Sequence, residues 1–186
     1  MPDIAMRVRK QPGCGATIEG VDLSKIGRAE ADALRGHLFE HGALFFRDQS
    51  LSPEDHIRLA ELIAPIDINR FFPADERWPM IAKVEKTAEQ TTNIGGGWHT
   101  DHSYDAAPAM GSVLVARDLP PSGGDTLFAD MYAAYETLDA ATKREIAGLR
   151  AVHVGGSDSH RPERSRSRST VVLPDSVTLP VAHSPT

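Results

Sequence analysis

Two residues that could hold a metal ion lie two positions apart near the middle of the chain. His99 offers an imidazole nitrogen and Asp101 a carboxylate oxygen. On an extended strand, side chains two positions apart point to the same face, so both could reach one ion while Thr100 points away. A His-x-Asp triplet also arises by chance in a chain with eight histidines. Taken alone, the triplet therefore leaves open a surface histidine beside an aspartate.

The segments around the triplet form a series of separated motifs. A glycine-rich stretch and a tryptophan precede it, and a strand followed by a proline- and glycine-rich turn comes after it. The series resembles the taurine dioxygenase and 2,4-dichlorophenoxyacetate dioxygenase (TauD/TfdA) family. The matching segments are Gly15-Ala16, Gly20-Val21-Asp22-Leu23, Phe46-Arg47-Asp48-Gln49, Trp98-His99-Thr100-Asp101, Pro120-Pro121-Ser122-Gly123-Gly124-Asp125-Thr126-Leu127 and Ala133-Ala134-Tyr135.

The resemblance implies a fold, a set of cofactors and an activity. The fold would be mainly β with flanking helices, a double-stranded β-helix or jelly roll of the cupin type. Iron(II) would be held by two imidazoles and one carboxylate, with His99 and Asp101 as two of these ligands and catalytic residues. The cosubstrate would be 2-oxoglutarate, with a hydrogen bond from the Thr126 hydroxyl to one of its carboxylates, and dioxygen would be the oxidant. The alternative for that hydroxyl is a turn-capping role. The implied reaction hydroxylates a small organic substrate and releases succinate and CO2.

The C-terminal part of the sequence departs from the family. Members have a second histidine ligand far downstream and, beyond it, an arginine that pairs with 2-oxoglutarate, and we find neither motif. The later histidines are expected at surface or packing positions; these are His102, His153, His160 and His183. We therefore expect a jelly roll that is incomplete at the C-terminus, in a fragment that binds iron weakly and turns over no 2-oxoglutarate. Residues 1–154 would form the N-terminal part of one dioxygenase domain, 155–170 a polar Arg/Ser-rich insert, and 171–186 the start of the missing half.

Four residues are candidates for substrate binding. In the taurine enzyme of this family, a histidine in the region corresponding to residues 68–72 holds the sulfonate. This sequence offers Asn69 and Arg70 there, which disfavours taurine itself. Arg70 could pair with an anionic substrate, although a loop arginine is more often simply solvated. His102 and Tyr104 follow the ligand pair and could line the pocket. We expect a sulfonate, a carboxylate or a sulfate ester.

The elements that must place these residues are predicted from periodicity and capping signals. Apolar residues at helical spacing predict a helix over residues 28–41 that ends at Gly42. An N-cap hydroxyl, a proline and two acidic residues at Ser52-Pro53-Glu54-Asp55 predict a second helix that ends near Ile63. Strands are expected at 15–23, 43–46, 80–84, 111–116, 126–128 and 151–154, and further helices at 131–138 and 140–149.

Composition restricts the class of protein. Hydrophobic residues make up 40% of the 186 residues and charged residues 25%, which is ordinary for one soluble globular domain. The net charge of -6 disfavours a nucleic-acid partner, and no apolar run is long enough for a membrane span. Cys14 is the only cysteine and has no partner for an internal disulfide. We expect a cytoplasmic protein with a small-molecule substrate, and a homo-oligomer is left open.

Three alternatives to an active dioxygenase remain. The chain could be a non-catalytic cupin-like binding protein or an inactive remnant of the enzyme. The arginine-serine run at residues 164–169 could bind RNA or be phosphorylated, but three Arg-Ser pairs without an RNA-binding module are too few. A zinc hydrolase using His99 and Asp101 lacks a further histidine or cysteine at zinc-like spacing.

Overall fold

The computed structural model describes residues 6–70, 72–87, 89–91, 97–101, 103, 105–150, 152–154, 168–170 and 182–185. For the last three segments the description is confined to the backbone. The elements, in chain order, are β1 (Arg7–Lys10), β2 (Ala16–Glu19), α1 (Arg28–His41), β3 (Leu44–Phe45), α2 (Pro53–Ile63), β4 (Thr126–Ala129), α3 (Met131–Glu136), α4 (Ala140–Ile146), β5 (Val152–Val154), β6 (Arg168–Thr170) and β7 (Ala182–Pro185).

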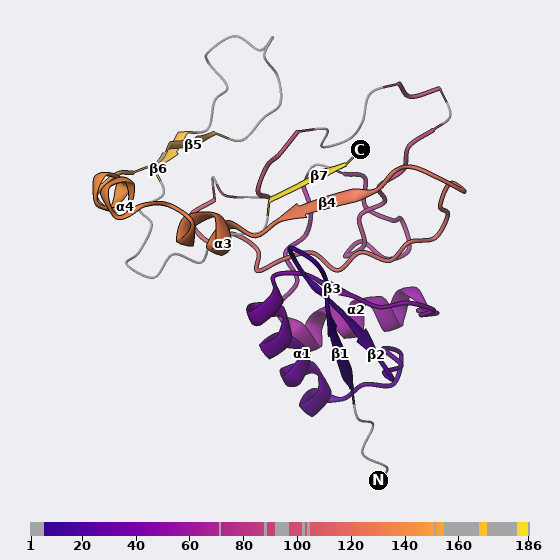
Figure 1. Cartoon of the computed structure of the whole chain (residues 1–186). Coiled ribbons are helices and arrows are strands. Elements are labelled where there is room, and N and C mark those ends of the chain that lie inside the picture. The colour runs from indigo at the N-terminus through magenta and orange to yellow at the C-terminus, as the bar shows by residue number, and fades with distance from the viewer. Residues whose placement is uncertain are drawn as a thin grey trace.

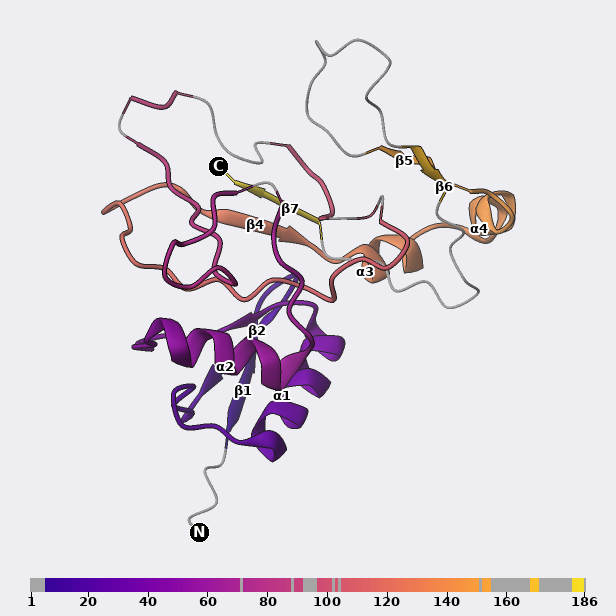
Figure 2. The same cartoon turned by 180° about the vertical axis from the view of Figure 1, so that it is seen from behind.

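The N-terminal elements form a three-stranded sheet covered by two helices. The strand order is β1-β2-β3, with β1 antiparallel to β2 and β3 parallel to β2. Because parallel neighbours cannot be joined by a tight turn, the chain crosses over through α1. Helices α1 and α2 lie on the same side of this sheet, as Figure 1 and the reverse view in Figure 2 show. Residues 6–64 thus form one layered unit.

Local capping fixes the bounds of both helices. Gly42 follows α1 with a φ of 75°, a left-handed conformation that favours glycine, and its N–H bonds to Leu38 O at 2.8 Å. Ser52 Oγ accepts a hydrogen bond from Asp55 N at 3.0 Å, and the Asp55 carboxylate accepts one from Ser52 N. The predicted helices over residues 28–41 and from Ser52 to Ile63 are confirmed.

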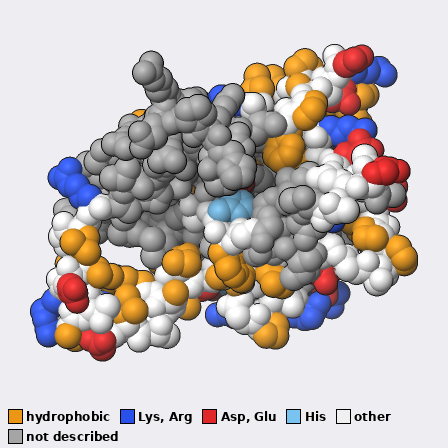
Figure 3. Space-filling view, turned by 90° about the horizontal axis from the view of Figure 1, so that it is seen from above, with side chains coloured by type: hydrophobic (Ala, Val, Ile, Leu, Met, Phe, Trp, Pro, Cys, Tyr) orange, Lys and Arg blue, Asp and Glu red, His pale blue; other side chains and the backbone are white. Residues whose placement is uncertain are grey.

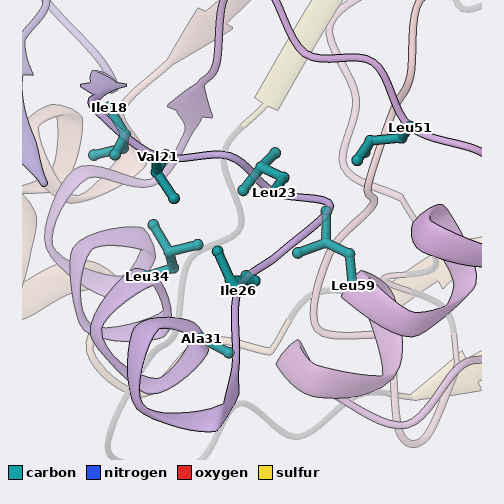
Figure 4. Packing of buried hydrophobic residues seen from close by; sticks show 8 residues of the cluster. All are labelled: Ile18, Val21, Leu23, Ile26, Ala31, Leu34, Leu51 and Leu59. Carbon is teal, nitrogen blue, oxygen red and sulfur yellow. The ribbon is translucent and has the colours of Figure 1, made fainter. Parts of the chain in front are cut away.

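The core of this unit lies between the sheet and the two helices. Its buried side chains point toward one another in Figure 4 and are Ile18, Val21, Leu23, Ile26, Ala31, Leu34, Leu51 and Leu59. The Arg58 guanidinium on α2 donates to the carbonyls of Leu23, Ser24 and Ile26 at 2.7 to 3.2 Å, which ties the loop before α1 to α2. The apolar contacts and these bonds together hold the unit as one body.

The remaining elements lie beside this unit (Figure 1). Strand β4 pairs antiparallel with β7, so that Phe128 lies opposite His183, and β5 pairs with β6. Phe45 of β3 and Phe128 of β4 make an edge-to-face contact with ring centres 5.8 Å apart. His56 Nε2 lies 2.9 Å from Val113 O, which links α2 to the segment before β4. The backbone that carries Thr126 is therefore packed against the N-terminal unit.

Two strand predictions are wrong, and three strands were not foreseen, β1, β6 and β7. Residues 80–84 form only an isolated bridge between Ala82 and Ala74, and residues 111–116 are irregular. A strand needs a hydrogen-bonded neighbour, and in the described part of the chain neither segment has a strand beside it. Strand β1 was missed because all four of its residues are exposed and give no alternating apolar pattern. None of the described helices is long and apolar enough to cross a membrane.

Candidate metal centre

The side chains of His99 and Asp101 converge. His99 Nε2 lies 3.3 Å from Asp101 Oδ1, and the side chains are 34% and 55% exposed. Neither residue belongs to a strand of the described sheets: His99 forms an isolated β-bridge, and Asp101 lies in a turn. The two side chains thus meet without the continuous strand that the sequence predicted.

A hydrogen bond orients the His99 ring. Its Nδ1 lies 2.8 Å from the carbonyl oxygen of Gly97. A carbonyl can only accept, so Nδ1 carries the proton and donates it, and in the neutral ring Nε2 presents a lone pair toward Asp101. A histidine that binds a metal through one ring nitrogen usually donates a hydrogen bond from the other nitrogen to a carbonyl or carboxylate, as His99 does here.

The pair fits a divalent transition-metal ion. An unprotonated imidazole nitrogen and a carboxylate oxygen are both acceptors, so at 3.3 Å they repel unless a proton or a cation lies between them. Neighbouring ligands of a first-row divalent ion lie about 3 Å apart, close to this separation. Imidazole and carboxylate are also the ligand types of non-haem iron(II) centres.

A third ligand is not found in the part of the chain that the structure describes. A single group of three metal-ligating side chains occurs there, and it lies on α1, not at His99 and Asp101. His102 and Tyr104, predicted to line the substrate pocket, lie outside the described residues, as do residues 155–167 of the predicted insert.

Thr126, the predicted 2-oxoglutarate donor, is the first residue of β4. Its side chain is exposed, and it follows a turn in which Gly123 and Gly124 have φ angles of 77° and 73°. These left-handed conformations favour glycine and explain the Gly-Gly pair before the strand. The turn presents Thr126 at the start of β4, and its role toward 2-oxoglutarate stays a prediction.

The two described substrate candidates have different surroundings. Asn69 Oδ1 accepts a hydrogen bond from Phe72 N at 3.0 Å, which is a local turn-forming contact. Arg70 Nη2 forms an ion pair with the Asp105 carboxylate, and both residues line a cavity of about 620 Å³ together with residues 64–67 and 107–110. Nothing in the sequence indicated a role for Asp105. It lies 35 positions after Arg70, and only the fold brings the two side chains together.

The family described as Taurine catabolism dioxygenase TauD, TfdA family matches residues 7–184. The chain belongs to this family. It is 33% identical over 142 residues to the (S)-phenoxypropionate/alpha-ketoglutarate-dioxygenase of Sphingobium herbicidovorans, covering 75% of this chain and 50% of that protein. It is 31% identical over 160 residues to the alpha-ketoglutarate-dependent 2,4-dichlorophenoxyacetate dioxygenase of Cupriavidus pinatubonensis, covering 76% of this chain and 55% of that protein.

Solved structures agree with the family assignment. A taurine dioxygenase from Burkholderia xenovorans superposes with a TM-score of 0.70 at 29% identity, over 81% of this chain and 54% of that one. The resemblance inferred from the motifs is confirmed, and the fold is that of TauD-type dioxygenases. Iron(II), 2-oxoglutarate (alpha-ketoglutarate) and dioxygen, the expected cofactors, are those that the family implies. The chain spans about half the length of the curated relatives it matches.

Proposed function

We propose that the protein carrying this sequence is an iron(II)- and 2-oxoglutarate-dependent dioxygenase that hydroxylates a small anionic organic substrate and releases succinate and CO2. The observation that carries the proposal is the convergence of His99 Nε2 and Asp101 Oδ1 at 3.3 Å, with His99 Nδ1 bonded to Gly97 O. The family match over residues 7–184 supports it.

The residues of this chain bind and orient the reactants. His99 and Asp101 supply two protein ligands, and the Gly97 carbonyl keeps the His99 ring turned toward the shared ion. The Thr126 hydroxyl donates a hydrogen bond to a carboxylate of 2-oxoglutarate. Iron, once bound with 2-oxoglutarate, supplies the activation of dioxygen that an amino-acid side chain cannot provide.

The centre needs more than these residues. We infer that a second histidine ligand and the arginine that pairs with 2-oxoglutarate come from outside the described residues, in the second half of a double-stranded β-helix. In this proposal residues 1–154 form the first part of the domain, 155–170 an insert and 171–186 the beginning of the second half. The greater length of the relatives supports this division. A cytoplasmic location and a homo-oligomer stay predictions.

Arg70 is the proposed anchor for the substrate anion. Its guanidinium presents several donors in a plane, and the Asp105 ion pair at the wall of the cavity fixes its direction. The names of the two curated relatives give carboxylic acids as substrates, and that of the solved structure gives a sulfonic acid, taurine. A carboxylate or a sulfonate therefore fits, the expected sulfate ester stays a prediction, and Asn69, His102 and Tyr104 are further candidate contacts.

Succinate formation tests the proposal. The protein, produced in its natural length, is incubated with iron(II), 2-oxoglutarate and a panel of aryloxyalkanoates, alkylsulfonates and alkyl sulfates. At least one class should increase succinate formation, and His99→Ala or Asp101→Ala should abolish it. Asp118→Asn, a change at an exposed aspartate outside the cavity, is the matched control and should keep the activity.

Two outcomes contradict the proposal. One is succinate formation that persists in both ligand variants. The other is iron binding without succinate for any member of the panel, which would favour the non-catalytic binding protein instead.

A further inference from the structure

A second group of metal-ligating side chains lies at the C-terminal end of α1. His37, Glu40 and His41 occupy helix positions i, i+3 and i+4, which share one face of a helix. Their ligand atoms all lie within 4.8 Å of one another, and within the described residues no other group of three such side chains is this close. The helix therefore presents two imidazoles and one carboxylate together.

The Glu40 carboxylate is the centre of this group. Its Oε2 lies 4.0 Å from His37 Nδ1 and 3.8 Å from His41 Nε2. The two imidazole rings are stacked at 12° with centres 6.1 Å apart. Small side-chain rotations would bring one atom of each residue to the ligand spacing of a single ion.

His41 is the buried member of the group. Its side chain is 6% exposed, and Nδ1 accepts or donates no hydrogen bond among the described residues. The ring nitrogen that faces the Glu40 carboxylate is Nε2, at 3.8 Å, and it is the His41 atom within reach of an ion shared with Glu40.

The surroundings favour a cation. The last turn of α1 carries the negative end of the helix dipole. Beside it lies a cleft of about 280 Å³ lined by Phe39, Glu40, His41, Gly42, Asp130 and Tyr132. Among the described residues, no lysine or arginine lines this cleft. Asp130 is the N-cap of α3, where its Oδ1 accepts from Tyr132 N and Ala133 N, and it adds a second carboxylate to the cleft.

We propose that His37, Glu40 and His41 bind a divalent transition-metal ion of the zinc type, in a site separate from His99 and Asp101. Imidazole and carboxylate are both common zinc ligands, and two histidines four positions apart on a helix are a common way to hold the ion. Asp130, which lines the same cleft as Glu40 and His41, is the candidate fourth ligand. The bound ion would join the end of α1 to the start of α3, directly after the strand that carries Thr126.

Zinc titration of the whole protein tests the site. His99→Ala/Asp101→Ala is the starting variant, because it removes the other pair of ligands. Calorimetry should show one Zn²⁺ bound per chain. Adding His37→Gln or Glu40→Gln should weaken binding by at least about tenfold, the scale seen even for changes outside the ligand shell. Asp32→Asn, at an exposed residue of α1 outside the group, is the control and should leave the affinity unchanged.

Thermal unfolding shows whether a variant loses zinc binding because it is misfolded. The His37 and Glu40 side chains are 30% and 66% exposed, so both variants should keep the melting temperature of the zinc-free protein. Zinc should raise that temperature in the starting variant and not after His37→Gln or Glu40→Gln. The inference is overturned if the starting variant binds no zinc, or if both substitutions leave the affinity unchanged.

Discussion

At the scale of single residues, the orientation of His99 depends on one backbone carbonyl. Gly97 O accepts the Nδ1 proton, and this bond decides which ring nitrogen faces Asp101. The ring and its acceptor are only two positions apart in the sequence, so the contact is local. The two ligands could be predicted from the sequence because they lie within a recognisable motif. The orientation of their side chains could not be predicted, because it depends on backbone geometry that the motif does not determine.

Arg70 gives a prediction at the same scale. Arg70→Ala removes the proposed anchor for the substrate anion and should raise KM for the preferred acid by about tenfold, with a smaller effect on kcat. Arg70→Lys keeps the charge but loses the planar fork, so an intermediate KM is expected. Steady-state succinate kinetics on the natural-length protein measure both variants. An unchanged KM in Arg70→Ala would exclude the arginine from substrate binding.

At the scale of elements, helices and strands were predicted correctly where the residues that define their ends lie close to those ends in the sequence. Helices α1 and α2 have their caps, Gly42 and Ser52, within a few residues of their ends, and their bounds were predicted correctly. The strands expected at 80–84 and 111–116 would have needed a neighbouring strand, and periodicity carries no information on that neighbour. The carbonyl of Val113 instead bonds to His56 of α2.

The loop between β2 and α1 gives a pH-dependent prediction. Hydrogen bonds from the side chains of Lys25 and Ser24 lower the pKa of Asp22 from 3.8 to about 2. The charged carboxylate is thus favoured in the folded state, and its stabilising contribution is complete above about pH 4 and lost as the pH falls toward 2. Asp22→Asn should therefore reduce the free energy of unfolding at neutral pH and have little effect near pH 2.

Carboxyl chemical shifts recorded by NMR during a pH titration measure that pKa directly. Lys25→Gln is the matched control, since it removes the main partner and should return the pKa of Asp22 toward 3.8. A midpoint near 3.8 in the unaltered protein would contradict the assigned contacts.

At the scale of the whole molecule, the N-terminal unit and the later segments differ in how many of their large apolar side chains are buried. The buried cluster lies in the N-terminal unit, whereas most of the exposed large apolar side chains lie in the later segments, with Leu114 at 77%, Leu119 at 73% and Leu149 at 66%. Figure 3 shows apolar side chains at several places on the described surface seen from above. Exposed apolar surface of this kind favours association between molecules.

The central claim, that His99 and Asp101 hold an iron(II) ion together with 2-oxoglutarate, has one direct measurement. Iron(II) is added without oxygen to the natural-length protein and 2-oxoglutarate, and the weak visible charge-transfer band of the iron–2-oxoglutarate complex is followed. We predict a band that saturates at one iron per chain, survives His37→Gln and disappears in His99→Ala and in Asp101→Ala. A band of full intensity in both ligand variants, or no band in the unaltered protein, would contradict the assignment.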